Sequence, residues 1–343
     1  MKALRKVAGG LGNMKLCDLD KPLPKDDEVL IKVMFSGICG SDIHAFKGEY
    51  NKQIPLTLGH EFIGIVQKKG DKVTDLAIGD RVVSETTYQV CEKCIHCLAQ
   101  EYNLCSQRTG LGTQVDGSFA TFVLAKTERC HKLPDTISNE VAALIEPLAC
   151  CIHAAMEKTH IHPNEKIAVF GPGPIGVLMA LVVKSLGAEV TLIGISKDAY
   201  RLAKAKELGV AQAIDSQTIE WTALLEEKTN QLDFDQVFEC SGSPQALQQA
   251  LEIVKKKGIV IQEGLFAKNP VPVDMSLLLN KEIQLIGSRT QKTSSWHKTI
   301  EWLQTSEIDL SPVITKILPL DQWEEAFRLA MNGEELKVLL KPE

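Results

Sequence analysis

Residues 166–262 alternate short apolar strands with helical stretches, and this alternation restricts the possible folds more than any other feature of the sequence. Four stretches read as strands, namely 166–170, 189–195, 236–239 and 258–262. Three stretches between them have helical spacing, namely 174–186, 199–208 and 244–254. Strands that alternate with helices at this interval form a parallel sheet with right-handed crossovers. The sequence therefore predicts an α/β domain built on a doubly wound parallel sheet.

The first strand–helix junction of this segment has the glycine pattern of a phosphate-binding loop. Gly171, Gly173 and Gly176 fit G-x-G-x-x-G, and the helix begins at Pro174 and Ile175. The glycines permit a tight turn and a close approach of backbone to a pyrophosphate, which the helix N-terminus then faces. Because the pattern lies between a strand and a helix, we expect dinucleotide binding rather than a glycine-rich turn without a ligand.

The end of the second predicted strand lacks the acid that grips the ribose 2′-hydroxyl in NAD sites, about 20 residues past the glycines. Ser196 and Lys197 stand there, and the nearest carboxylate, Asp198, is expected to open the next helix. Ser196, Lys197 and Arg201 can hold a 2′-phosphate, which favours NADP over NAD. The alternative is that the two basic residues form only a solvated helix face.

Four of the ten cysteines lie within one short loop, spaced Cys91-x2-Cys94-x2-Cys97-x7-Cys105. A reducing compartment disfavours disulfides, so clustered cysteines indicate a metal site or a catalytic role. Four thiolates suit tetrahedral zinc with no open position, which is a structural site. An iron–sulfur cluster fits less well, because the ferredoxin run has a shorter last gap followed by Pro, whereas Ser106 follows here. Unrelated thiols are the third reading.

Short β runs punctuated by Gly and Asp fill the first 145 residues or so and predict a small barrel or sandwich. The clearest are residues 28–34, 62–66 and 81–83. Near the C-terminus we expect helices over 296–303 and 322–331 and a closing strand over 335–340. The basic run 255–257 is expected to end a helix.

A second, catalytic metal site is predicted from Cys39 and His60, with a carboxylate from Glu61 or Glu146 as the third ligand. Alone, such a cysteine is usually a core residue and such a His-Glu pair a surface feature. Together with a dinucleotide site they indicate catalysis. Zinc with an open coordination position activates an alcohol oxygen, and the carbinol carbon can then lose a hydride.

The alcohol proton must also leave the site. Ser41 and His44 follow Cys39 closely, and histidine titrates near neutral pH. We therefore expect these two residues to relay the proton.

At these residues the sequence resembles the zinc-dependent medium-chain alcohol and polyol dehydrogenases, in the sorbitol dehydrogenase-like branch that includes threonine and butanediol dehydrogenases. The resemblance covers essentially the whole chain and is carried by residues 37–42, 59–61, 146–148 and 171–176 together with the four-cysteine loop. It implies a GroES-like catalytic domain formed by residues 1–148 and 288–343, a Rossmann domain formed by 149–287, and an active site in the cleft.

The resemblance also implies roles for single residues. Cys39 and His60 match catalytic zinc ligands, Glu61 matches a third ligand of the polyol branch, and Glu146 matches a ligand or a group that orders the zinc water. Cys150 or Cys151 could compete for the metal.

Two basic residues could face the substrate. Arg289 lies near a substrate-facing arginine of polyol enzymes, although its spacing to Trp296 differs, and its alternative is a hinge or surface position. Lys47 and Arg289 could serve a substrate phosphate.

Composition excludes several classes of protein. Hydrophobic residues make up 44% and charged residues 24%, as in an ordinary globular chain, and the net charge of −6 is not that of a nucleic-acid binder. No export signal is visible and the longest apolar run is too short for a membrane. We expect a cytoplasmic homo-oligomer, a dimer or tetramer, that pairs through an edge strand near residues 262–265.

Together these features predict an oxidoreductase that moves a hydride between a secondary alcohol, such as a polyol that yields a ketose, and NADP or NAD. It would hold two zinc ions per chain. The alternatives are a threonine, butanediol or sugar-alcohol-phosphate substrate and, from a different class, a non-catalytic nucleotide-binding relative.

Overall fold

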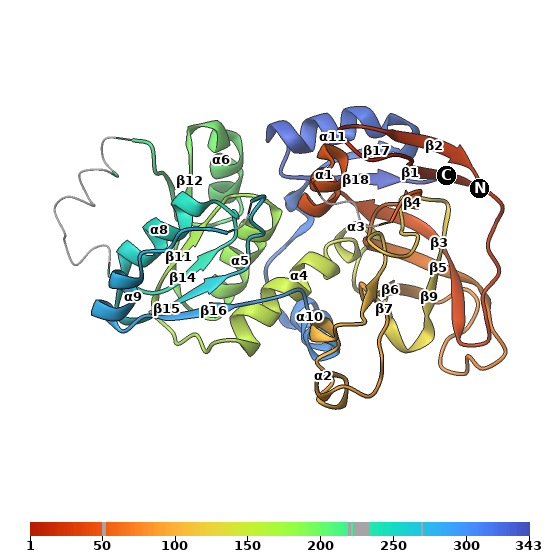
Figure 1. The fold of residues 1–343 in the computed structure, drawn as a ribbon, viewed down its shortest axis with the longest axis horizontal. Helices are drawn as coiled ribbons and strands as arrows, with labels where there is room; N and C mark the ends of the chain where they lie inside the picture. The colour runs from red at the N-terminus through yellow and green to blue at the C-terminus, as the bar shows by residue number, and fades with distance from the viewer. Residues whose placement is uncertain (50–52, 219–220, 222–232, 269) are drawn as a thin grey trace. The chain divides into compact units, whose positions relative to one another are not determined.

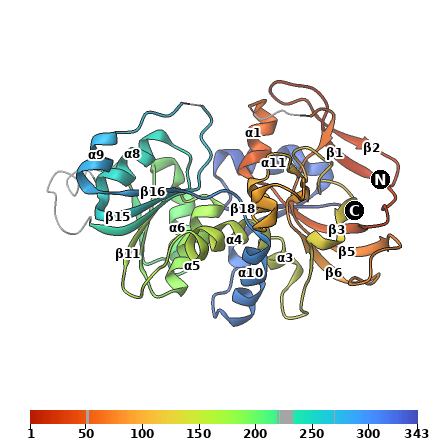
Figure 2. The same cartoon turned by 60° about the horizontal axis from the view of Figure 1, so that its bottom comes forward.

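A computed structural model describes residues 1–49, 53–218, 221, 233–268 and 270–343 (Figures 1 and 2). The chain divides into two compact units. Unit 1 comprises Met1–Ala149, Gln291–Thr305 and Asp309–Glu343, and unit 2 comprises Cys150–Thr290 and Ser306–Ile308.

The main sheet of unit 1 joins strands from both ends of the chain (Figure 1). In order it contains β10 (Cys130–Lys132), β6 (Arg81–Ser84), β5 (Glu61–Lys69), β3 (Glu28–Gly37), β18 (Lys337–Lys341) and β17 (Ile314–Pro319), and β9 (Phe122–Lys126) also pairs with β3. Nearly all of β3 is buried, because apolar side chains cover both of its faces. Its end lies between two neighbours, since Gly37 pairs with Glu61 of β5 and with Leu339 of β18.

Smaller elements complete unit 1. A second sheet has the order β2 (Met14–Asp18), β1 (Lys2–Lys6), β4 (Leu56–Thr57), and β7 (Thr87–Gln89) pairs with β8 (Thr109–Gly110). The helices are α1 (Gly40–Lys47), α2 (Ile95–Leu98), α3 (Asn139–Ala142), α4 (Ile145–Ile152, which runs on into unit 2), α10 (Thr293–Thr305) and α11 (Trp323–Asn332). Helix α11 packs its apolar face on a core that includes Leu4, Phe119 and Phe327.

Unit 2 contains the predicted parallel sheet, with helices on it (Figure 2). In order its strands are β13 (Gln212–Asp215), β12 (Glu189–Gly194), β11 (Lys166–Phe170), β14 (Phe234–Glu239), β15 (Val254–Gln262) and β16 (Gln284–Gly287), and all neighbours run parallel. Its helices include α5 (Pro174–Ser185), α6 (Ala199–Glu207), α8 (Pro244–Ile253) and α9 (Met275–Lys281). The strand order is that of a doubly wound fold. Strands β12 and β13 lie on one side of β11, and β14, β15 and β16 lie on the other, so the glycine loop after β11 lies at the point where the strand order reverses.

Two expectations about unit 2 are wrong. Lys255–Lys257 do not end a helix but belong to β15, where Lys257 has a φ of +60° and the register with β14 is irregular. Residues 262–265 are not at a sheet edge, because β15 pairs with β14 on one side and β16 on the other. The edges are β13 and β16.

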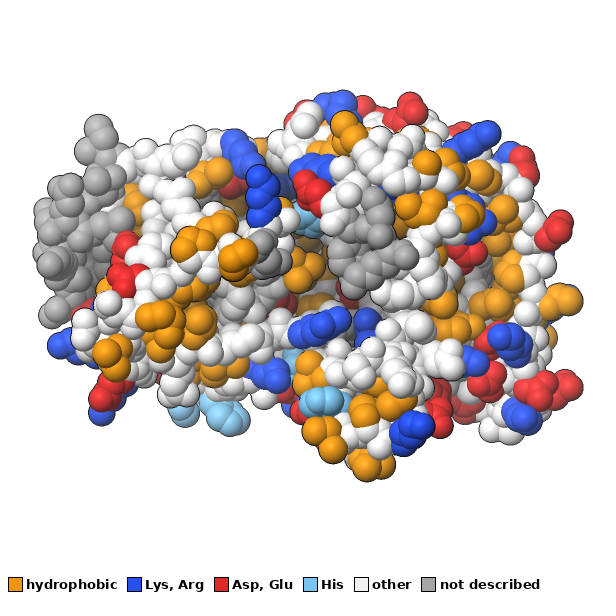
Figure 3. Space-filling view, in the orientation of Figure 1, with side chains coloured by type: hydrophobic (Ala, Val, Ile, Leu, Met, Phe, Trp, Pro, Cys, Tyr) orange, Lys and Arg blue, Asp and Glu red, His pale blue; other side chains and the backbone are white. Residues whose placement is uncertain are grey.

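Acidic and basic side chains are interspersed over the face in Figure 3. Among the described residues, no helix has the length and apolar character that a membrane crossing requires.

Candidate metal centres and cofactor site

The first candidate metal centre lies in unit 1, at the end of the main sheet where β3 ends and β5 begins. One donor atom from each of Cys39, His60 and Glu61 lies within 4.8 Å of the other two. The antiparallel pair Gly37 and Glu61 explains this, because the loop that leaves β3 and the loop that enters β5 meet at the same sheet end. Cys39 is half-buried, whereas His60 and Glu61 are buried.

Asp42 links the two loops, and sequence reasoning missed it. One of its carboxylate oxygens accepts the backbone N–H of Cys39 at 3.0 Å, and the other accepts that of Gly59 at 3.2 Å. The second oxygen also lies 3.9 Å from His60 Nδ1. Asp42 is 2% exposed, so its carboxylate positions both the cysteine and the histidine. The sequence did contain a signal for this role. Asp42 lies three residues after Cys39, which precedes α1, and this is the acid position of a helix capping box.

Glu61 forms a buried ion pair with Lys337, a second residue that sequence reasoning missed. Lys337 Nζ contacts Glu61 Oε2 and also donates to the carbonyl of Ile38 at 3.1 Å. Both side chains are at most 2% exposed. Gly37 leaves the space, since a Cβ there would overlap the Glu61 carboxylate and the lysine tip. The sequence signal for this ion pair was a lysine within the largely apolar strand predicted over residues 335–340.

Glu146 lies beside this cluster but is not in the three-residue group. It is buried on α4, interacts electrostatically with His60 and Glu61, and accepts a hydrogen bond from Gln291 Nε2 at 2.7 Å. Burial raises the pKa of the Glu146 carboxyl to about 7; the positive charge of His60 opposes this shift, and the negative charge of Glu61 adds to it. Nothing in the sequence pointed to Gln291.

The donor set fits a metal ion such as zinc, which takes three protein ligands and keeps one open position. Burial opposes protonation of His60, but the neighbouring Cys39 and Asp42 outweigh it and raise the pKa of His60 well above its usual value. His60 Nδ1 is also buried without a hydrogen-bond partner among the described residues. The thiol and carboxylate groups around His60 form a negatively charged environment, which favours the binding of a metal cation.

Ser41 and His44 lie on α1 directly after Cys39 and are half-buried. Residues three apart share a helix face, so the two side chains are neighbours. His44 Nδ1 lies 2.6 Å from Glu49 Oε2.

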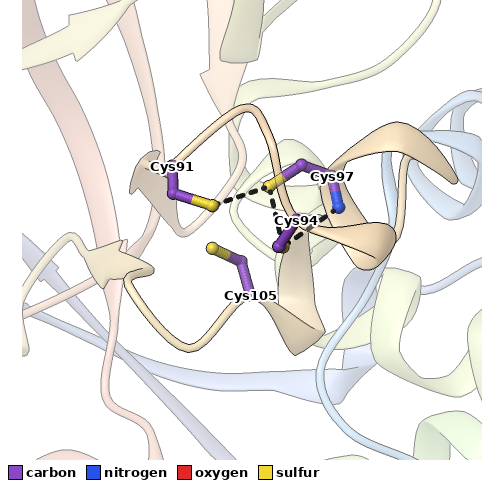
Figure 4. A group of neighbouring side chains, drawn as sticks. All are labelled: Cys91, Cys94, Cys97 and Cys105. Atoms are coloured by element: carbon purple, nitrogen blue, oxygen red, sulfur yellow. Dashed lines mark hydrogen bonds between the residues drawn. The ribbon is translucent and has the colours of Figure 1, made fainter.

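The second candidate metal centre is the four-cysteine loop (Figure 4). The four sulfur atoms all lie within 4.8 Å of one another, with Cys94 and Cys97 at 3.5 Å and Cys91 and Cys97 at 3.9 Å. Tetrahedral zinc with its usual bond of about 2.3 Å sets ligand sulfurs about 3.8 Å apart. Backbone hydrogen bonds from Lys93 and Cys94 lower the pKa of the Cys91 thiol to about 6, which favours the thiolate that a metal needs.

The loop is anchored to the rest of unit 1 through an aromatic ring. Arg129 lies over the ring of Tyr102 at 3.9 Å from its centroid, and its guanidinium reaches Glu85 at 3.6 Å. Tyr102 packs on the cysteine cluster, so the metal loop and the sheet share this contact.

The glycine loop of unit 2 has the cradle that a phosphate needs. Gly171 has a φ of +92°, and a Cβ there would lie 2.7 Å from Ser241. At Gly176 a Cβ would lie 1.8 Å from the Gly171 carbonyl. At Gly173, by contrast, a Cβ would meet nothing within 4 Å, so the backbone at the start of α5 has an open face. The residues present therefore fit a dinucleotide phosphate.

The remaining predicted residues also lie in unit 2. Ser196 and Lys197 are exposed after β12, and Arg201 is half-buried on α6. Cys151 donates to the Ile175 carbonyl at 3.5 Å, and neither Cys150 nor Cys151 is in a metal-binding group of the described residues. Arg289 is exposed just past β16.

Comparison with known proteins identifies the family. Residues 25–135 match the alcohol dehydrogenase GroES-like domain, and residues 174–305 match the zinc-binding dehydrogenase domain. D-arabitol-phosphate dehydrogenase of Enterococcus avium is 45% identical over 342 residues, covering 99% of this chain and 97% of that protein. Sorbitol dehydrogenase of Halalkalibacterium halodurans is 43% identical, covering 100% and 99%. The chain therefore belongs to the zinc-dependent medium-chain dehydrogenases, and it is an NAD(P)-dependent oxidoreductase of alcohols.

Solved structures agree with this assignment. Galactitol-1-phosphate dehydrogenase from Escherichia coli superposes with a TM-score of 0.90 at 29% identity, covering 100% of both chains. A zinc-binding dehydrogenase from Sinorhizobium meliloti bound to NADP gives 0.85 at 28%, and an alcohol dehydrogenase from E. coli CFT073 bound to NADH gives 0.88 at 26%, each covering 99% of both chains. The predicted GroES-like and Rossmann fold classes and the predicted family are thereby confirmed.

Proposed function

We propose that this enzyme oxidises a secondary hydroxyl of a polyol to a ketone, reversibly, with one zinc ion at Cys39, His60 and Glu61. The observation that carries the proposal is the convergence of one thiol, one imidazole and one carboxylate within 4.8 Å. This donor set differs from the two-cysteine, one-histidine set of alcohol dehydrogenases of the better-known type. Residues 1–148 and 288–343 would form the catalytic domain and 149–287 the cofactor domain.

Bound zinc would supply a Lewis acid for the substrate oxygen, and a bound nicotinamide cofactor would supply the hydride acceptor. The chain's own residues do the rest. Cys39, His60 and Glu61 hold the metal, Asp42 orients the first two, and Lys337 balances the charge of Glu61.

Ser41 and His44 would take the proton that the hydroxyl loses. In this assignment Ser41 Oγ accepts the proton while donating its own to His44 Nε2, and Glu49 holds the opposite ring nitrogen. His44 is 28% exposed at its side chain, so it can release a proton to solvent. Glu146 would either bind the metal as a fourth ligand or hold the water molecule that the metal binds.

A second zinc would occupy Cys91, Cys94, Cys97 and Cys105 and stabilise that loop without taking part in the reaction. The cofactor would bind at Gly171, Gly173, Pro174, Ile175 and Gly176. NADP is slightly favoured over NAD on the charges of Lys197 and Arg201. We also propose a homo-oligomer, a dimer or tetramer, and a cytoplasmic location.

A sugar-alcohol phosphate is the second candidate substrate, supported by the names of the Enterococcus relative and the galactitol-1-phosphate enzyme. Lys47, exposed at the end of α1 and three residues past His44, could meet a phosphate. Threonine and 2,3-butanediol remain alternatives.

The test combines metal analysis with a substrate panel. Purified enzyme is assayed for zinc and for NAD- and NADP-linked oxidation of sorbitol, xylitol, their phosphates, galactitol 1-phosphate, 2,3-butanediol and threonine. About two zinc ions per chain, one lost in Cys39→Ala, with turnover of a polyol or polyol phosphate would support the proposal. A zinc content that Cys39→Ala leaves unchanged, with no turnover of any alcohol, would contradict it.

A further inference from the structure

The end of β12 carries no acid of its own, but the structure brings a carboxylate there from the neighbouring strand. Asp215 is the last residue of β13 and pairs in parallel register with Gly194, the last residue of β12. The hydroxyl of Ser196, two residues past β12, donates to Asp215 Oδ2 at 2.7 Å. A carboxylate therefore lies beside the end of β12, the strand end from which Rossmann folds read the adenosine ribose.

The carboxylate is held in place rather than loosely exposed. The backbone N–H of Gln217 donates to Asp215 Oδ1 at 2.9 Å, and the Gln217 side-chain oxygen accepts the N–H of Ser196 at 3.1 Å. Ser216 adds two bonds to the Gly194 carbonyl, from its N–H at 2.8 Å and its hydroxyl at 2.9 Å. These bonds join the loops after β12 and β13.

The same strand end touches the phosphate cradle. Gly194 packs so closely on the glycine loop that a Cβ there would lie 2.7 Å from Pro172 Cγ. A dinucleotide whose pyrophosphate lies on that loop extends its adenosine ribose along the end of β12. Asp215 and Ser196 are polar side chains at that strand end.

An acidic side chain of the protein partly balances the positive charge near the end of β12. Asp198 interacts electrostatically with Arg201, and its Oδ2 accepts the backbone N–H of Ile195 at 3.2 Å, as expected for an acid that opens a helix. Lys197 is exposed. A 2′-phosphate would therefore meet two cations and two carboxylates.

We propose that Asp215 reads the 2′ position of the adenosine ribose and limits discrimination in favour of NADP. Its carboxylate accepts the 2′-hydroxyl of NAD, and its charge opposes the 2′-phosphate of NADP against the attraction of Lys197 and Arg201. This inference rests on the proposed cofactor site and adds the group that sets its specificity.

The test is equilibrium binding of NADH and of NADPH to the full-length enzyme, followed by nicotinamide fluorescence. Asp215→Asn should bind NADPH about tenfold more tightly and NADH a few-fold more weakly, because the charge is lost while the side-chain shape stays. Ser196→Ala removes the hydroxyl that donates to Asp215 but leaves the charge of Asp215 in place, so it should change the NADPH-to-NADH affinity ratio less than Asp215→Asn does.

Glu189→Gln is the matched control, because Glu189 is exposed at the other end of β12, about 16–17 Å away along the strand. It should leave the ratio unchanged. Equal changes in both affinities for Asp215→Asn, or loss of both, would overturn the inference and assign Asp215 a structural role. A wild-type enzyme that binds NADPH over 100-fold more tightly than NADH would also overturn it. If the wild type binds neither cofactor, the proposed function itself fails.

Discussion

Lys337 and Glu61 form an ion pair that is almost completely withdrawn from water, and Glu61 belongs to the candidate metal-binding group with Cys39 and His60. Lys337→Met should cost about 3 kcal/mol of unfolding free energy, because it leaves the Glu61 charge buried without its partner. Urea denaturation of metal-free enzyme measures this. Added zinc should recover part of the loss, since the metal then balances Glu61.

Lys341→Met is the control for that variant, because Lys341 is exposed at the other end of β18. A change below about 0.5 kcal/mol is expected there. Equal effects of the two variants would show that the pair contributes nothing specific.

Asp42→Asn should weaken catalytic zinc binding about 10- to 100-fold, because the amide can no longer accept both backbone N–H groups and stabilise His60. Zinc analysis after dialysis against a mild chelator should find one ion in place of two, since the four-cysteine site is untouched. Asp71→Asn, at an exposed position, should retain both ions. Retention of both by Asp42→Asn as well would show that Asp42 does not position the site.

Cys97→Ser should remove the second zinc and loosen the loop around it. Cys97 is 6% exposed and its sulfur is within 3.9 Å of two others, so its loss leaves three ligands for a tetrahedral ion. We expect one zinc per chain and rapid proteolysis between residues 90 and 106. Cys17→Ser, on β2, controls for removal of a thiol. A loop that stays protected without zinc would argue against a structural metal.

Gly173→Ala should separate cofactor binding from folding. A Cβ at Gly173 meets no protein atom within 4 Å, so the variant should keep the wild-type thermal midpoint to within a degree or two. The methyl group would fill the space that the pyrophosphate needs, and NADH affinity should fall at least tenfold. Gly9→Ala, also free of steric conflict, is the control. Unchanged affinity would place the phosphate elsewhere.

Asp235 should make unit 2 more stable above pH 4 than below it. Partial burial works against its ionisation, but hydrogen bonds from Lys255 and the Lys166 backbone outweigh this and lower the pKa of Asp235. A carboxyl whose pKa is lower in the folded state stabilises the fold above its unfolded pKa, and that contribution is lost as the pH falls through the folded pKa. Asp235→Asn should cost up to about 1 kcal/mol at pH 7 and nothing near pH 2.

Urea midpoints at several pH values test this, with the exposed Asp20→Asn as reference. A wild-type minus variant difference that persists at the lowest pH would contradict the role of the ion pair.

Local pattern was enough to predict much of this protein. Strand β11 was predicted to the residue, and α5, α6 and α8 to within one residue, because each has a periodic apolar pattern and a clear start or stop. The four cysteines and the pair at His60 were equally visible, since their chemistry is set by residue type and short spacing. These features depend on neighbours in the chain, which a sequence shows directly.

Tertiary structure decided which distant residues serve the same site. Strand β13 has a weak pattern and was not predicted, so Asp215 could not be placed beside Ser196. Lys337 reaches Glu61 across 276 residues only because β18 pairs with β3 and β3 with β5. Sequence determined the elements and the ligand types, whereas strand pairing, which depends on long-range packing, decided the charges around each site.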